Sequence, residues 1–447
     1  MARYELDKEF WQISRSGTAV TVRSGKLGNK GRTTVKHHPT AAAAKLHHDE
    51  LVIAKLRDGY LRVDGDDPAP PAVDTASDDR TEALVARIVE DPTDVEAWMV
   101  YGDLLQRQGD PRGELMALQH AAEARRAANP RARGPVQAAV GKHLAKHAPA
   151  LLGPLASYVK DVRDPAAPPF FWRSGFIHRL VLASGGDDLG AITEAVLRHP
   201  SGRLLQELGV RSEGRDDVHA VLDVIRREPP RALQELDLFA RADLGDLGDV
   251  WAAVPRLRRL ALTARSFELG ELRVPAVQRA RFLGLALSPR CIHAIAAAAW
   301  PVLERLELRI GNRFGKVSAA FEDLRPLLVR TDMPALTHLK IRGSGFAGAI
   351  CRALAGSPLA GQLVVLDLSH GVINPQDAKI LGEHASRFKE LRELWIPLTG
   401  LWGDAAKALA GVAKHVISDK RSPLDTLEYD LGVDDSDPAD RYEDVEE

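Results

Sequence analysis

Apolar and polar residues alternate with a period of two in three segments near the start of the chain, and this alternation is typical of half-buried β-strands. The segments span residues 10–15, 19–24 and 31–37, and glycines stand around them at positions 17, 25, 28 and 31. A helical stretch follows at 41–60, where Thr40 can cap the start and Gly59 can end it. The pattern therefore predicts a small antiparallel sheet packed by one helix.

From Thr81 onward, the apolar residues follow a helical period instead. They are Leu84, Ile88, Trp98, Tyr101, Leu105, Leu115 and Leu118. Breaks at Asp91-Pro92 and at Gly109-Asp-Pro111 divide this region into successive helices. Between the two regions, residues 64–80 are acidic, rich in proline and alanine and poor in large apolar residues, which predicts a linker.

An L-x-x-L-x-L pattern recurs through most of the remaining chain. Its first position falls at Ile177, Leu205, Leu233, Leu257, Phe282, Leu303, Leu336, Leu363, Leu391 and Leu424. Successive copies lie 21–33 residues apart, which overlaps the period of about 20–29 residues in leucine-rich repeats. Amphipathic stretches such as 378–388 and 405–412 lie between the copies. Each unit therefore reads as a strand followed by a helix, and stacked units would form a parallel sheet.

Residues 4–63 carry a family resemblance in their order and spacing. The matching residues are Trp11-Gln-Ile13, Val20-Thr-Val22-Arg23-Ser-Gly25-Lys-Leu27-Gly28, Gly31-Arg32, Ala44, Lys55 and Gly59-Tyr60. They resemble the WGR domain of DNA-damage-responsive poly(ADP-ribose) polymerases and many bacterial proteins, and the resemblance implies contact with nucleic acid. The name-giving tripeptide reads Ser24-Gly25-Lys26 here. The aromatic ring that packs on a nucleotide in the family is absent, and lysine replaces the forked arginine, which weakens DNA-end recognition but leaves phosphate affinity.

A second resemblance lies in the helical region. It rests on Asp91-Pro92, Trp98, Tyr101-Gly-Asp103, Gly109-Asp-Pro-Arg-Gly-Glu114, Leu151-Leu-Gly-Pro154 and Trp172-x-x-Gly175-Phe176. These residues resemble the repeat-companion domain of large-genome bacteria such as myxobacteria. That family commonly precedes repeat arrays, and the resemblance implies no activity.

Together these patterns predict an α/β protein. We expect a leucine-rich-repeat-like solenoid with a helical N-terminal cap region, preceded by a small WGR-like domain of an antiparallel sheet plus a helix. The expected parts are a WGR-like domain at 1–63, an acidic linker at 64–80, a helical repeat-companion region at 81–175, a leucine-rich-repeat-like array at 176–430 and an acidic tail at 431–447.

The net charge of −2 hides a strong asymmetry. Residues 1–63 carry twelve Lys and Arg against six Asp and Glu, whereas residues 64–80 carry one against six and residues 430–447 carry one against nine. A basic segment beside acidic ones favours an anionic partner. The acidic tail could equally serve only to keep the chain soluble.

Basic residues on two adjacent predicted strands and the glycine-rich turn between them form the candidate nucleic-acid site. They are Arg23, Lys26, Lys30, Arg32 and Lys36. Clustered cations beside exposed backbone amides can hold phosphate without reading bases. A solvated hairpin with no ligand is the alternative.

Positions marked x in the repeat should point away from the helices and form the candidate protein-binding face. The residues chosen from these positions are Arg305, Glu307, His338, Lys340, Asp367 and Trp395. Their mixed charge suits a protein partner better than a bare polyanion. Trp395 could anchor that partner, or it could cover the end of the array.

The sequence holds no G-x-S-x-G elbow, H-E-x-x-H pair or glycine-rich dinucleotide fingerprint. The segment 311–317 resembles a phosphate loop, but it is one residue short and Val317 stands where Ser or Thr would hold magnesium. Cys291 and Cys351 read as small buried apolar residues. We therefore expect no enzymatic activity and no cofactor.

Four histidines of the N-terminal segment, at 37, 38, 47 and 48, raise the question of a metal site. His47 and Glu50 could share a helix face, but zinc needs three or four converging ligands and a third would have to come from elsewhere. We expect surface histidines and no metal.

These observations favour a non-enzymatic recognition or adaptor protein. The array would bind a protein partner, and the WGR-like domain would contact nucleic acid. In the alternative, the protein is a DNA-damage or nucleic-acid sensor in which the WGR-like domain is the main functional module. Two cysteines and no apolar run of membrane-spanning length favour a reducing cytoplasm and no membrane.

Overall fold

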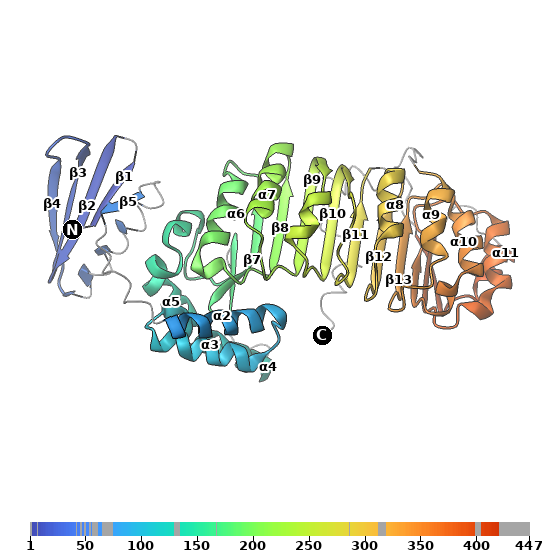
Figure 1. The fold of residues 1–447 in the computed structure, drawn as a ribbon, viewed down its shortest axis with the longest axis horizontal. Helices are drawn as coiled ribbons and strands as arrows, with labels where there is room; N and C mark the ends of the chain where they lie inside the picture. The colour runs from blue at the N-terminus through green and yellow to red at the C-terminus, as the bar shows by residue number, and fades with distance from the viewer. Residues whose placement is uncertain are drawn as a thin grey trace. The chain divides into compact units, whose positions relative to one another are not determined.

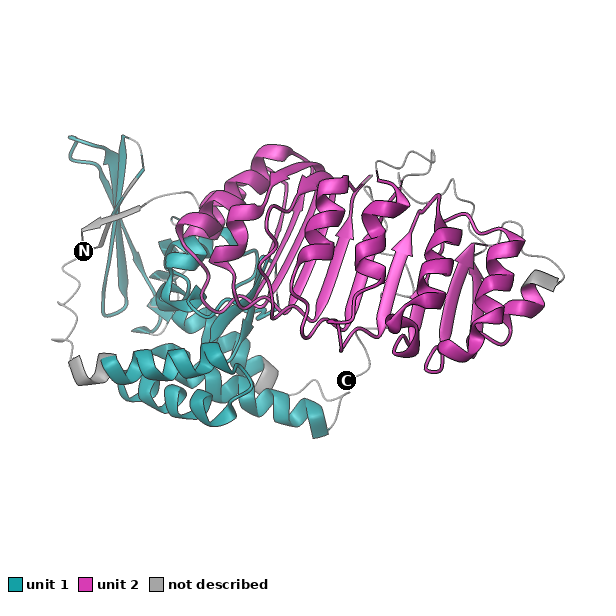
Figure 2. Cartoon of the chain, turned by 45° about the vertical axis from the view of Figure 1, so that its right-hand side comes forward, with its two compact units in different colours: residues 1–180, 195–205 teal, residues 181–194, 206–447 magenta. Residues whose placement is uncertain are grey.

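The structure is a computed structural model, shown in Figure 1. It describes residues 2–6, 8–41, 43–44, 47–48, 51–52, 55, 61–64, 75–128, 135–166, 168–285, 287–311, 319–397 and 404–419. The chain divides into two compact units (Figure 2). Unit 1 comprises residues 1–180 and 195–205, and unit 2 comprises residues 181–194 and 206–447. Within the described residues, no helix combines the length and the apolar character needed to cross a bilayer.

Unit 1 begins with an antiparallel sheet of strand order β4-β3-β2-β1-β5. The strands are β1 (Ala2–Leu6), β2 (Glu9–Ser16), β3 (Ala19–Lys26), β4 (Arg32–His37) and β5 (Leu61–Asp64). The alternating segments thus correspond to β2, β3 and β4, and the predicted N-terminal antiparallel sheet is confirmed. β1 and β5 were not predicted, because each is short and carries too few large apolar residues for alternation to stand out.

One face of this sheet builds the core with the helical residues after it. Trp11, Ile13 and Val20 are buried there together with Ala44 and Val52. The Oγ1 of Thr40 accepts a hydrogen bond from the Ala43 N–H at 3.1 Å, which caps the first helical turn. Gly59, the predicted helix end, lies outside the described residues.

The rest of unit 1 is mainly helical. Its elements are α2 (Thr75–Glu90), α3 (Val95–Arg107), α4 (Pro111–Ala128), α5 (Pro135–Leu151), η1 (Gly153–Tyr158), β6 (Phe170–Arg173), β7 (Phe176–Ala183) and η2 (Pro200–Gly202). β6 and β7 form an antiparallel hairpin. α2 begins six residues before Thr81, inside the predicted linker. Acidic residues stabilise the first turns of a helix because they lie near the positive end of its dipole. A linker predicted from composition alone does not take this effect into account.

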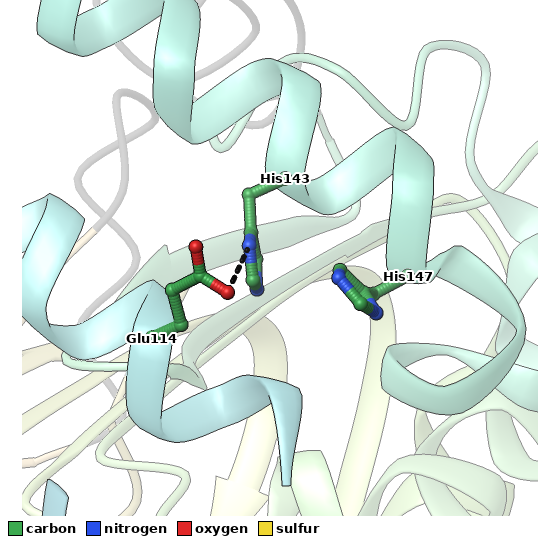
Figure 3. A group of neighbouring side chains, drawn as sticks. All are labelled: Glu114, His143 and His147. Atoms are coloured by element: carbon green, nitrogen blue, oxygen red, sulfur yellow. Dashed lines mark ion pairs between the residues drawn. The ribbon is translucent and has the colours of Figure 1, made fainter. Parts of the chain in front are cut away.

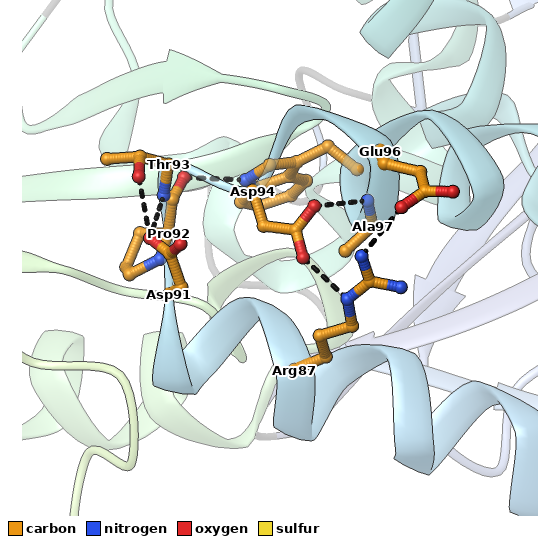
Figure 4. A network of polar contacts seen from close by, with 8 residues as sticks. Arg87, Asp91, Pro92, Thr93, Asp94, Glu96 and Ala97 are labelled. Carbon is orange, nitrogen blue, oxygen red and sulfur yellow. Dashed lines mark hydrogen bonds and ion pairs between the residues drawn. The ribbon is translucent and has the colours of Figure 1, made fainter.

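The turn between α2 and α3 is fixed by its own polar side chains (Figure 4). Asp91 Oδ1 accepts hydrogen bonds from the N–H and hydroxyl of Thr93, at 2.9 and 2.6 Å. Asp94 caps α3 by accepting from the Ala97 N–H at 2.9 Å. Arg87 of α2 donates to Asp94 at 2.5 Å and joins the two helices. This network explains why the Asp-Pro-x-Asp sequence separates two helices.

The remaining motif residues of this region pack elements closely together. A Cβ on Gly113 would lie 2.6 Å from Gln106 N and 2.7 Å from Gly102 O, so only glycine lets α3 and α4 approach this closely. Buried Gln119 of α4 donates to Trp172 O at 3.1 Å and accepts from the Gly175 N–H at 2.7 Å. The α4 helix thereby holds the β6–β7 turn in place. The motif residues of this region thus serve to pack its helices and strands together.

Unit 2 contains a large sheet in which β8 to β16 pair in parallel, each with the next strand along the chain. The strands are β8 (Glu207–Ser212), β9 (Glu235–Asp246), β10 (Arg259–Glu268), β11 (Arg279–Leu283), β12 (Arg305–Arg309), β13 (His338–Arg342), β14 (Val365–Asp367), β15 (Glu393–Pro397) and β16 (His415–Asp419). The predicted parallel sheet is therefore confirmed.

Helices lie between these strands along the chain. They are α6 (Leu189–Arg198), α7 (Arg215–Arg227), α8 (Pro289–Ala297), α9 (Phe321–Leu328), α10 (Ala347–Gly356), α11 (Pro375–Glu383) and α12 (Asp404–Leu409), with short helices η3 (Gly248–Ala253), η4 (Pro358–Gly361) and η5 (Ala385–Arg387). Figure 1 shows α7 to α11 along one face of the sheet of unit 2. The apolar residues at the second and fourth core positions of most of these strands, such as Leu306 and Leu308 of β12, are buried.

The strand register corrects one of the ten predicted repeat positions. Leu262 of β10 pairs with Phe282, so the fifth copy begins at Val277 and not at Phe282. Small Ala280 occupies the middle position and weakens the apolar signal, while Leu285 and Leu287 imitate a copy displaced by five residues. The last described strand is β16, and the tenth predicted position, Leu424, lies outside the described residues.

Candidate nucleic-acid interface and the charged sheet face

Three of the five predicted basic residues lie on one face of the N-terminal sheet. The register pairs Ser24 with Arg32 and Val20 with Lys36, so the alternation of β3 and β4 places Lys26, Arg32 and Lys36 on the same side. All six residues of β4 are exposed, and β4 is an edge strand of the described sheet. The same side of the sheet also carries the buried Trp11, Ile13 and Val20, so the three exposed cations lie beside the core, at the end of β3 and along the β4 edge.

Arg23 lies on the opposite face and supports the glycine-rich turn. Its Nε donates to Lys30 O at 2.6 Å, and its guanidinium lies 5.8 Å from the centre of the buried Phe10 ring. Gly31 has a φ of +67°, and a Cβ there would lie 2.6 Å from that ring. Arg23 and Phe10 thus hold the turn that carries exposed Lys30.

His38 follows β4 directly but adds little positive charge at neutral pH, because its pKa is lowered. Burial lowers its pKa, and the nearby charges of His47, Lys36 and His37 lower it further. The His38 and His47 rings lie 4.8 Å apart. His38 is therefore neutral at neutral pH, and the positive charge of this region comes from lysine and arginine.

The six residues predicted to bind a protein share one face of the unit 2 sheet. Arg305 pairs with His338, while Glu307 pairs with Lys340, Lys340 with Asp367 and Asp367 with Trp395. Part of this face is hollowed, with a cavity of about 240 Å³. Its charged lining residues are Asp237, Arg259, Arg279, Arg281, Arg305, Glu307, His338 and Lys340. We call the side chains of β9–β15 on this side the charged sheet face.

Glu307 lies at the electrostatic centre of the charged sheet face, and its side chain is 12% exposed. Burial raises the pKa of Glu307, but the charges of Arg342, Arg281, Lys340 and Arg309 outweigh that effect, and its net pKa lies below the usual range. Its carboxylate lies 3.1 Å from Arg342 Nη1 and 3.5 Å from Arg281 Nε. The carboxylate therefore stays ionised and holds the surrounding cations in place.

Asp367 has little surface to offer a partner, since it is only 3% exposed. It accepts hydrogen bonds from Arg342 Nε at 2.9 Å and from the Ser369 N–H at 2.8 Å. Trp395 is half-buried, and its Nε1 donates to Glu393 Oε2 at 3.1 Å. The hydrogen bonds of Asp367 are thus made within the protein, whereas part of the Trp395 ring is accessible to a partner.

Sequence reasoning missed three arginines of this face, at 279, 281 and 342. Arg279 and Arg281 fall at x positions only when the fifth repeat copy begins at Val277, as the register shows. If the fifth repeat copy had been started at Val277, the sequence alone would have placed Arg279 and Arg281 on this face.

Neither cysteine is placed for nucleophilic chemistry. Both are buried, and burial strongly raises the pKa of Cys291 and raises that of Cys351 to about 12. Their thiols therefore remain protonated near neutral pH. Residues 312–318, which hold most of the segment resembling a phosphate loop, lie outside the described residues.

Comparisons with known proteins inform the N-terminal sheet. The chain has no match among curated proteins. It is similar to the crystal structure of a structural genomics target from Bacteroides fragilis, with 16% sequence identity and a TM-score of 0.43 over 94% of this chain and 96% of that chain. Residues 5–67 match the WGR domain family. The predicted resemblance is confirmed, and this part of the chain is a WGR domain.

Proposed function

We propose that the protein is a non-enzymatic recognition protein whose WGR domain contacts the phosphate backbone of nucleic acid. The carrying observation is the shared face of Lys26, Arg32 and Lys36 at the open edge of a domain matched to the WGR family. Phosphate contacts depend on clustered exposed cations and position a protein without reading sequence. Exposed Lys30 adds a further cation at the glycine-rich turn, where its carbonyl oxygen accepts a hydrogen bond from Arg23.

Binding through phosphates suits this variant of the domain better than binding to a base at a strand end. Ser24 stands where an aromatic residue would stack, so a contribution of about 1–3 kcal/mol per stacked base is missing. Lys26 supplies a point charge and not the fork of an arginine. We therefore expect modest affinity and little preference for sequence or for DNA ends.

Charge reversal in the full chain tests this proposal. Lys26→Glu, Arg32→Glu and Lys36→Glu are combined and compared with a control that combines Lys379→Glu, Lys389→Glu and Lys414→Glu. The control residues are exposed residues of unit 2, and both triple variants change the net charge equally. Fluorescence anisotropy with a labelled duplex should show binding lost in the first variant and retained in the control. Equal loss in both would mean that only net charge matters, and the proposal would fail.

A second component of the proposal concerns unit 2. We propose that its strand–helix units form a leucine-rich-repeat-like solenoid and that the charged sheet face binds a protein partner. The in-order parallel strands, the hollow of about 240 Å³ and the accessible part of Trp395 support it. A face of mixed charge around an aromatic residue is typical of a protein-binding surface.

The partner proposal has its own test. Nuclease-treated host extract is passed over the immobilised full chain, over Trp395→Ala with Arg305→Glu, and over a Lys379→Glu control. A partner of the charged sheet face should be retained by the wild type and the control and lost from the double variant. Equal retention by all three would contradict the proposed surface.

A further inference from the structure

The first turn of α4 carries Glu114, a residue of the repeat-companion motif that neither caps a helix nor fills the core. Its side chain is 62% exposed, yet its Oε2 lies 3.5 Å from Nδ1 of His143 on α5. His143 is itself buried, with 5% exposure. An acidic side chain at the surface is thus aimed at a buried imidazole on the neighbouring helix (Figure 3).

The hydrogen bonding of His143 fixes which of its nitrogens faces Glu114. Its Nε2 lies 2.8 Å from Pro111 O, and a carbonyl oxygen can only accept, so Nε2 carries the hydrogen. In the neutral ring, Nδ1 then presents a lone pair toward a carboxylate oxygen, which also has no hydrogen to donate. A cation between these two atoms would satisfy both. Metal-bound histidines are usually oriented in this way, with the second ring nitrogen donating to a carbonyl.

His147 adds a third donor from the same face of α5. It follows His143 by four residues, the spacing that brings two side chains together on a helix. The two rings lie 4.5 Å apart, and ligand atoms of Glu114, His143 and His147 all lie within 4.8 Å of one another. In a tetrahedral zinc site with bonds of about 2.1 Å, ligand atoms are roughly 3.4 Å apart. The Glu114–His143 pair already has this separation, and a small rotation of His147 would complete the set.

We propose that Glu114, His143 and His147 form a zinc site that joins α4 to α5. Two imidazoles and one carboxylate are ligands that zinc accepts, and three protein ligands leave its fourth position to water or another donor. The exposed side of Glu114 gives the ion access from solvent. Zinc bound there links the first turn of α4 with α5 and stabilises this helix pair.

The test uses the full chain after treatment with a chelator. Zinc is titrated in competition with a fluorescent chelator into the wild type, Glu114→Gln, His147→Gln and a His120→Gln control. His120 is an exposed histidine of α4 outside the cluster, so its loss matches the change in composition. Circular dichroism confirms that each variant is folded, and hydrogen exchange of peptides covering α4 and α5 reports where the ion binds.

The wild type and His120→Gln should each take up one equivalent of zinc, with slower hydrogen exchange in α4 and α5. Glu114→Gln and His147→Gln should lose that equivalent and the slower exchange. Failure of the wild type to bind zinc would overturn the proposal and leave a proton between His143 and Glu114. Zinc uptake that survives both ligand substitutions would also overturn it, since the ion would then lie at other histidines.

Discussion

Glu307 of β12 and Arg342 of β13 form an ion pair, with 3.1 Å between Oε1 and Nη1, although they are not partners in the strand register. Arg342 also donates to Asp367 of β14, and Arg281 of β11 approaches Glu307 from the other side. Opposite charges thus alternate across four neighbouring strands. The predicted binding residues Glu307 and Asp367 are part of what holds this face together.

Removing the carboxylate of Glu307 should destabilise unit 2. Glu307→Gln removes the negative charge between Arg281 and Arg342, so that only Asp367 still balances Arg342, and breaking such a partly buried ion pair costs up to roughly 3 kcal/mol. Hydrogen exchange of peptides covering β11 to β14 should accelerate. Exposed Glu304 provides the control, because Glu304→Gln should change stability by less than about 0.5 kcal/mol. Equal effects of the two substitutions would show that the ion pair is dispensable.

Unit 1 should lose stability between neutral and mildly acidic pH through two histidines. Burial lowers the pKa of His178 and that of His199, each to about 4. Because the folded pKa values lie below the unfolded value near 6.5, the unfolded chain binds more protons between these limits. The stabilisation is complete above about pH 6.5 and is lost as the pH falls toward 4, by about 3 kcal/mol after allowance for partial exposure.

The measurement is hydrogen exchange of peptides covering residues 170–180 and 195–205, corrected for the intrinsic rate at each pH. Protection should fall from pH 7 to pH 4.5 in the wild type and much less in a variant with His178→Gln and His199→Gln. A wild-type profile that stays flat across this window would show that the two rings are not held neutral.

The glycine-rich turn of the WGR domain provides a matched pair of substitutions. Gly31 and Gly17 both have positive φ, at +67° and +56°. A Cβ on Gly31 would meet Phe10 at 2.6 Å, whereas a Cβ on Gly17 meets nothing within 4 Å. Gly17→Ala should therefore cost about 1 kcal/mol from backbone strain alone, and Gly31→Ala should cost about 1–3 kcal/mol more through overpacking. Thermal unfolding of the two variants checks this order, and a larger loss for Gly17→Ala would contradict the arrangement around Phe10.

Much of the fold follows from the period of apolar residues. Alternation found β2 and β3 because one face of the sheet is buried, and it also found β4, whose six residues are all exposed. The leucine pattern found most parallel strands because their second and fourth core positions are buried in most copies. The pattern failed at β11, where small Ala280 replaces the central leucine. It also gave α2 a late start, because an acidic first turn resembles a linker in composition.

The candidate sites were harder to predict, since they depend on contacts between distant residues. Sequence placed Arg23 with the other cations, but its side chain lies on the opposite face and holds the turn. His143 and His147 were overlooked because their third partner, Glu114, lies on another helix 29 positions before His143. The spacing of four residues on α5 brings only these two donors together, and the packing of α4 on α5 brings the carboxylate to them.

The salt dependence of nucleic-acid binding tests the central claim most directly. If Lys26, Arg32 and Lys36 each neutralise a phosphate, log K for a short duplex should fall with log salt at a slope of about −3 for the full chain. The triple glutamate variant should show no salt-dependent binding. A wild-type slope near zero, or the same slope in both proteins, would contradict phosphate binding by this face of the WGR domain.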